Sequence, residues 1–163
     1  MTVHDATSDS ALGLRAGTAE VAITPPAGCE MIHRRADQGI HDHLWARTLA
    51  FSDGRVAAAV VGLDLISLSR VQVERIRARV RERLAAVAGL PPVVPAGLLL
   101  CCSHTHSGPV TNHFRGWGHA DQAYVDALVE KVAAGVQTAF ERLTPCRLSY
   151  GEAPLQVGCN RRL

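Results

Sequence analysis

Two apolar runs separated by a helical pattern place the strongest constraint on the fold of this chain. Val56–Ile66 and Gly97–Cys102 are nearly continuous apolar segments, and the first is typical of a strand that is covered on both faces. Between them, Ser69 is a candidate helix N-cap, and apolar residues recur at helical spacing over residues 73–87 until Gly and Pro intervene at 89–92. A strand, a helix and a strand in this order predict a parallel, right-handed unit.

The remaining segments complete a layered domain. The turn signal Asp53-Gly54 predicts a hairpin that ends in the first apolar strand. The other expected elements are strands at Leu14–Thr24, Leu44–Phe51 and Cys146–Tyr150 and a helix at Asp121–Leu143. We therefore expect a flexible N-terminus over residues 1–13 and an α/β domain over residues 14–163, with a layered mixed β-sheet and flanking helices.

Composition narrows the classes of partner. The 163 residues are 47% hydrophobic and carry a net charge of only +2, as in a globular domain that buries a core. The arginines at 75–83 alternate with apolar and acidic residues, which favours a solvated helix face. With so few aromatic side chains available for base stacking, nucleic acid is not an expected partner. No segment has the apolar length of a membrane span, and residues 1–11 are polar, without the apolar region of a signal peptide. Five cysteines without a C-x-x-C pair favour the cytoplasm.

A histidine pair follows the second apolar run. His104 and His106 stand two residues apart, just after the strand candidate and before Ser107-Gly108-Pro109. Alternate residues of an extended chain point to the same side, so both imidazoles are expected to face one cavity at the mouth of a strand. Imidazole is a common metal ligand and general acid or base. The alternative interpretation is a pair of loop histidines in water.

Most of the other histidines also lie in expected loops. His33, His41, His43, His113 and His119 fall in or beside the irregular segments 27–42 and 107–120. Long loops without secondary structure are often functional, so this clustering favours a site. Asp64, near the end of its strand, could orient a histidine as a hydrogen-bond acceptor, or could instead cap the next helix or accept a backbone N–H.

Several motifs in order along the chain resemble the neutral/alkaline, non-lysosomal ceramidase family. They are Ala16-Gly17, Val21–Pro26, Gly39–Asp42, Leu63-Asp64-Leu65, Ser103–Pro109, Cys146–Leu148 and Asn160–Arg162. The most specific of these is Ser103–Pro109, and the resemblance covers almost the whole chain from residue 14 onward.

The resemblance implies a zinc-dependent amidase that cleaves the N-acyl bond of a sphingolipid-like substrate. It assigns zinc binding to His104 and a catalytic role to His106, and it places Arg161 in the same pocket. His41 and Asp64 are expected to contribute to substrate binding. The expected partner is a small-molecule N-acyl amide or a sphingolipid-like substrate.

The resemblance also implies that the site is incomplete in this chain. A catalytic zinc takes about three protein ligands, and the family draws the remaining ones from segments beyond residue 163. We therefore expect an N-terminal fragment that is weak or inactive alone and that needs a C-terminal companion segment. The alternative is a non-catalytic remnant or an α/β module completed by a partner chain. Amidohydrolase barrels and metallo-β-lactamase-like hydrolases also carry H-x-H, but the chain is short for the former, and no Asp-His follows Ser107 as in the latter.

Overall fold

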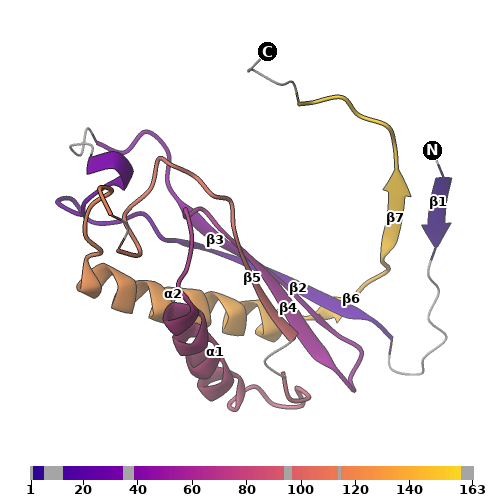
Figure 1. Ribbon diagram of the computed structural model, residues 1–163. Coiled ribbons are helices and arrows are strands. Elements are labelled where there is room, and N and C mark those ends of the chain that lie inside the picture. Colours follow the sequence, from indigo (N-terminus) through magenta and orange to yellow (C-terminus); the bar gives the residue numbers. More distant parts are fainter. Residues whose placement is uncertain (1, 6–12, 35–38, 94–96, 114, 159–163) are drawn as a thin grey trace.

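A five-stranded mixed sheet backed by two helices forms the body of the molecule in the computed structural model, which describes residues 2–5, 13–34, 39–93, 97–113 and 115–158 (Figure 1). Its strands are β2 (Arg15–Ala22), β3 (Trp45–Ser52), β4 (Ala57–Leu63), β5 (Leu98–Cys102) and β6 (Thr144–Pro145), in the spatial order β5-β4-β3-β2-β6. The helices are α1 (Arg70–Leu84) and α2 (Gln122–Glu141). The expected α/β fold class is confirmed.

The strand–helix–strand unit occurs where the sequence predicts it. β4 and β5 pair in parallel, with Val61 opposite Leu100, and α1 connects them. Ser69 caps α1 through a capping box, because its side chain accepts from the Gln72 N–H while the Gln72 side chain accepts from the Ser69 N–H. The helix ends at Leu84, which is earlier than the glycine and prolines at 89–92 suggest.

The hairpin between β3 and β4 is also confirmed. Asp53 makes the turn by accepting hydrogen bonds from the backbone N–H groups of Arg55 and Val56, both at 2.8 Å. These two donors stabilise the ionised carboxylate and lower the pKa of Asp53. The local geometry therefore follows from the Asp-Gly pair itself.

Both helices lie on the same face of the sheet (Figure 1). Alternate residues of β3 and β4, such as Ala50 and Val61, are buried against them. The residues between these point to the other face, where Leu49, Val60 and Leu99 are 39%, 40% and 54% exposed. The prediction that the apolar strand is covered on both faces is therefore wrong for the part of the chain that the structure describes, because the helices do not divide between the faces.

The end of the chain also differs from the prediction. Cys146–Tyr150 is not one strand, since the chain forms β6 beside β2, leaves the sheet at residues 146–148 and then forms β7 (Ser149–Glu152). β7 pairs with β1 (Thr2–Asp5) in a separate two-stranded sheet. The short η1 turn (Ile32–Arg34) is the remaining element. Within the described residues, no helix is both long and apolar enough to cross a membrane.

Candidate functional site

Two loops meet beside the carboxyl ends of β4 and β5. The backbone N–H of Ile32 donates to Gly108 O at 3.0 Å, and that of Val110 donates to Glu30 O at 2.9 Å. Ile32, Ile66 and Val110 form a small buried cluster below this contact, with Trp117 packed against it. The first His-rich loop is thereby fixed against the loop that follows the histidine pair.

The backbone at His104 is a turn rather than an extended strand. β5 ends at Cys102, and the N–H groups of Ser103 and His104 donate to Leu63 O and Leu65 O at 2.9 and 3.0 Å. His104 itself has a φ of 61°, in the left-handed region that non-glycine residues rarely occupy. Residues in such strained conformations cluster at functional sites.

The imidazole of His104 is oriented by a backbone carbonyl. Its Nδ1 lies 2.9 Å from Ile66 O, which can only accept, so Nδ1 carries the proton and Nε2 has the lone pair. Histidines that bind metals in proteins are commonly held in this way through the nitrogen that does not touch the metal. His104 therefore has the geometry of a prepared Nε2 ligand.

His106 lies against His104, although not by strand alternation. The two ring centroids are 5.2 Å apart and meet edge to face. The Nδ1 atom of His106 is 3.1 Å from the Nε2 atom of His33, and the Trp117 ring centroid is 5.4 Å from that of His106. The sequence predicted the proximity of His104 and His106, but it is the left-handed turn that produces it.

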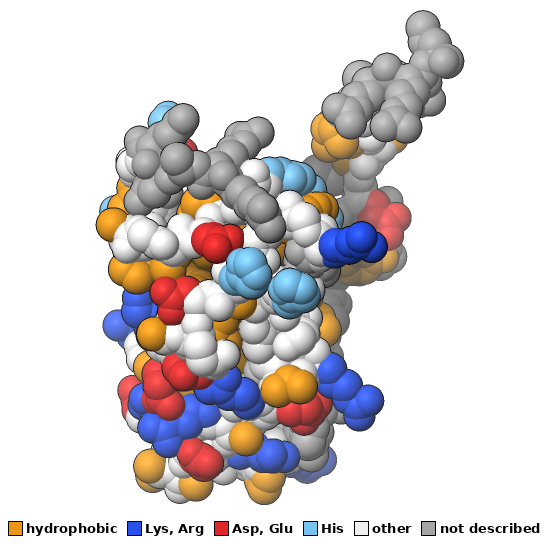
Figure 2. All heavy atoms as spheres, turned by 60° about the vertical axis from the view of Figure 1, so that its left-hand side comes forward, with side chains coloured by type: hydrophobic (Ala, Val, Ile, Leu, Met, Phe, Trp, Pro, Cys, Tyr) orange, Lys and Arg blue, Asp and Glu red, His pale blue; other side chains and the backbone are white. Residues whose placement is uncertain are grey.

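A cavity of about 880 Å³ opens next to this pair. Its lining combines apolar side chains, among them Pro25, Ile32 and Leu44, with polar ones, among them Asp64, Ser103 and His106. His104 is not among the lining residues. Figure 2 shows pale blue histidine side chains on the upper half of this face, whereas Arg, Lys, Asp and Glu crowd the lower half. The volume and mixed lining fit a small amphiphilic ligand.

Asp64 lines the cavity, but its bonds are to its own sheet. Its Oδ2 accepts from the backbone N–H of Trp45 at 3.0 Å and from Arg47 Nη1 at 3.3 Å. The histidine partner that the sequence analysis considered is not among these contacts; the backbone N–H that it also considered is. Asp64 thus shapes the wall by joining β3 to the end of β4.

His41 lies on the rim of the cavity. Its side chain is 95% exposed, and its Nδ1 is 2.7 Å from the carboxylate of Asp42. His43, two residues further on, lies 3.1 Å from the Thr24 hydroxyl through its Nδ1. These residues can meet a ligand that enters the cavity, but they do not touch the His104–His106 pair.

The last predicted site residue, Arg161, lies outside the described residues. Among the residues that are described, no group of three or more His, Cys, Asp or Glu side chains is arranged to hold a metal ion. Cys102 directly precedes the turn, and burial raises the pKa of its thiol, so it is not an activated nucleophile.

Three residues of the site had no role in the sequence analysis. His33 was noted only as a loop histidine, and Trp117 and Glu30 were not noted at all. Glu30 ties the two loops together by accepting from the His119 N–H at 2.9 Å. The glycines on both sides of Trp117 were the available signal, because such a segment turns sharply and presents its single large side chain to a neighbour.

Solved structures support the family resemblance. The fold is similar to that of a ceramidase complexed with C2, with 25% sequence identity and a TM-score of 0.63 over 82% of this chain and 22% of that one. It is also similar to the neutral ceramidase from Pseudomonas aeruginosa, with 25% identity and a TM-score of 0.65 over 83% of this chain and 23% of that one. The chain thus spans less than a quarter of the length of these structures. No protein-family model and no curated protein matches it.

Proposed function

We propose that this chain carries part of the active site of a zinc-dependent amidohydrolase that cleaves the N-acyl bond of a ceramide-like amide. The observation that carries the proposal is the His104–His106 ring pair, which stands at the end of β5 in a ceramidase-like fold and beside an amphiphilic cavity. The similarity to ceramidases supports a hydrolase; zinc and the amide substrate are the proposed refinements.

His104 is the proposed zinc ligand. Its Nδ1–H is held by Ile66 O, so its Nε2 lone pair is available without a change of tautomer. When bound, zinc polarises a carbonyl and lowers the pKa of a coordinated water to about 7. The other zinc ligands are proposed to come from outside the described residues. His104 is then the ligand that the described residues supply.

His106 is the proposed catalytic partner. It borders the cavity, and its Nδ1 is occupied by the contact with His33, so its Nε2 is the atom that can reach a substrate. An N–H group at that place stabilises the oxyanion that develops as an amide carbonyl becomes tetrahedral. Arg161 is proposed to contact the substrate as well, and this assignment stays a prediction.

The cavity supports an N-acyl amide as the substrate class. Apolar lining residues such as Pro25, Ile32 and Leu44 offer a surface for part of an acyl chain, while His41, His43 and Asp64 in the same lining can meet a hydroxylated or charged head group. One of the similar ceramidases is complexed with C2. We propose that His41 and Asp64 act in substrate binding, Asp64 by keeping Trp45 and Arg47 in place.

The second candidate function is that of a module whose zinc site is completed by another segment or chain. Since the matched ceramidases are several times longer than the aligned region, this chain is proposed to act with a C-terminal companion segment or a partner chain that completes the ligand set.

The proposed compartment is the cytoplasm, which the unbridged cysteines within the described residues support.

An assay of amide hydrolysis tests the proposed function. The chain is assayed alone and together with the product of any adjacent reading frame, against short- and long-chain N-acyl amides, carboxylic esters and phosphate esters. We expect sub-stoichiometric zinc and little turnover alone, and amide cleavage that a chelator abolishes in the combination. Cleavage of esters or phosphates only would contradict the amidase assignment. No cleavage by any combination would favour the non-catalytic module.

A further inference from the structure

His33 makes a contact with His106 that neither the fold nor the proposed zinc chemistry requires. The two atoms involved, His33 Nε2 and His106 Nδ1, are 3.1 Å apart, and the ring centroids are 5.3 Å apart. The residues lie 73 positions apart in sequence. At this distance one nitrogen donates a hydrogen bond and the other accepts it.

The backbone of His33 is held in a conformation that points its ring at this partner. His33 has a φ of 66° inside the η1 turn, and a non-glycine residue in the left-handed region costs about 1–2 kcal/mol. Its neighbour Ile32 is buried and donates to Gly108 O, so the chain is anchored immediately before the strained residue. The anchor directs one side chain inward and leaves the next to meet His106.

Trp117 completes the arrangement. Its ring centroid lies 4.9 Å from that of His33 and 5.4 Å from that of His106, so it contacts both imidazoles. Both histidines are exposed, and an exposed hydrogen bond adds little to stability. The strain at His33 is therefore not explained by folding energy, and a role in the site accounts for it better.

We propose that His33 is a positioning residue that donates from Nε2 to His106 Nδ1 and so holds His106 as the Nε2–H tautomer. In that tautomer His106 presents a hydrogen-bond donor to the cavity, as an oxyanion requires. The hydrogen bond is a feature of the structure, whereas the direction of donation is chosen because the proposed oxyanion needs a donor, so the tautomer and its catalytic consequence rest on the proposed function. The tautomer and the turnover can nevertheless be tested apart.

The first test reads the tautomer directly by NMR. The 163-residue chain is labelled with ¹⁵N-histidine and studied at about pH 8.5, well above the ordinary imidazole pKa of about 6.5. We expect the ring ¹⁵N shifts of His106 to report the Nε2–H form alone, with nuclear Overhauser contacts to Trp117. An Nδ1–H tautomer in the wild-type chain would overturn the proposal.

Matched substitutions separate positioning from folding. His33→Asn tolerates a left-handed backbone, but its short amide does not reach His106, so both His106 tautomers should appear and the Trp117 contacts should weaken. His33→Gln places an amide N–H near the position of the imidazole Nε2 and should restore the single tautomer. His113→Asn is the control, because His113 packs on His119 instead and should leave His106 unchanged.

The second test measures amide turnover by the chain together with the companion product with which it is active. His33→Asn should lower kcat about tenfold with KM within twofold of wild type, and His33→Gln should recover most of the loss. A His106 tautomer that is unchanged in His33→Asn would refute the positioning role even if amide cleavage is found. Absence of amide cleavage with the expected tautomer shift would refute the proposed function and leave the positioning role standing.

Discussion

At the scale of single residues, the site depends on two backbone turns that sequence patterns do not reveal. His104 and His33 both adopt left-handed conformations, with φ values of 61° and 66°. Period-two alternation predicts that His104 and His106 share a side of a strand, yet the strand ends two residues before His104. The rings still meet, because Leu65 O and Ile66 O fix the backbone and ring of His104. The sequence therefore predicts which histidines form the site, but it does not predict the backbone turn that brings their rings together.

Substitution of the two histidines should separate metal binding from catalysis. His104→Ala removes the Nε2 ligand and is expected to abolish zinc binding and amide cleavage. His106→Ala removes the proposed donor to the oxyanion, so turnover should fall about 10²-fold or more while most of the zinc is retained. Zinc content is measured by metal analysis after dialysis. Turnover is measured with the chain and its companion product together. Equal zinc loss in both variants would contradict this division of roles.

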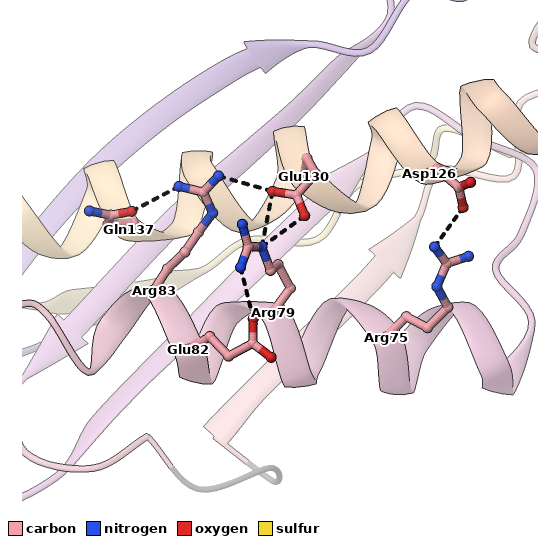
Figure 3. A network of polar contacts seen from close by, with 7 residues as sticks. All are labelled: Arg75, Arg79, Glu82, Arg83, Asp126, Glu130 and Gln137. Carbon is pink, nitrogen blue, oxygen red and sulfur yellow. Dashed lines mark hydrogen bonds and ion pairs between the residues drawn. The ribbon is translucent and has the colours of Figure 1, made fainter.

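At the scale of elements, α1 and α2 are joined by an ion-pair ladder. Arg75 pairs with Asp126, while Arg79 and Arg83 both pair with Glu130, at 2.6, 2.8 and 3.0 Å respectively (Figure 3). The sequence predicts a solvated helix face for these arginines. Arg75 is exposed, but Arg79 and Arg83 are partly covered, because the i, i+4 spacing of the three arginines matches the acidic residues on α2. That match is visible only once the helices are side by side.

Acid should weaken this helix contact in a way that depends on Glu130. Hydrogen bonds from Arg79 and then Arg83 lower the pKa of Glu130 below its usual 4.5. The unfolded chain thus takes up the proton first, and the stabilisation is present above about pH 4.5 and is lost as the pH falls through the folded-state pKa. Glu130→Gln should lower the melting temperature near neutral pH, and its difference from wild type should shrink on acidification to about pH 3.

The matched control for this prediction is Glu74→Gln. Glu74 pairs with Arg77 within α1, three residues away, and so does not join the helices. Thermal unfolding followed by circular dichroism across the pH range should show a smaller effect of this substitution at neutral pH. A difference between Glu130→Gln and wild type that stays constant from neutral to acid pH would contradict the proposed source of the stabilisation.

At the scale of the whole molecule, the close approach of β2 to the end of α2 sets the packing of helix on sheet. A methyl group added at Gly17 would collide with the backbone of Ala139 and of Arg142, neither of which can move independently of α2. Gly17 has no unusual backbone dihedral, so it is the lack of a side chain that matters here. At this point the sheet and α2 are too close for any side chain at residue 17.

Gly17→Ala should therefore destabilise the fold strongly. We expect a loss of about 2 kcal/mol or more in the free energy of unfolding, since overpacking against backbone is not relieved by a rotamer change. Gly62→Ala is the control in the same sheet, where the new methyl group would meet only Arg47 O at 4.0 Å. Urea unfolding of both variants checks the prediction. A Gly17→Ala chain as stable as Gly62→Ala would contradict the tight approach.

The sequence by itself determined the local elements and the chemistry available to the site. Apolar periodicity, the Ser69 cap and the Asp53-Gly54 turn each act within a few residues, and they predicted four of the five strands of the mixed sheet, β2 to β5, as well as both helices and the parallel unit. The order of several motifs along the chain, of which Ser103–Pro109 is the most specific, predicted a resemblance to ceramidases, which the solved structures support.

Only the tertiary structure decided which groups from distant segments meet. The placement of both helices on one face, the departure of the chain from the sheet after β6, and the contact of His33 and Trp117 with His106 all depend on packing between segments tens of residues apart. Such contacts are set by the burial of Ile32, Ile66 and Val110 beneath the loops and by backbone bonds across them. Neither the buried cluster nor the backbone hydrogen bonds can be recognised from the local sequence, because any apolar residue can be buried there and any peptide group can form such a bond.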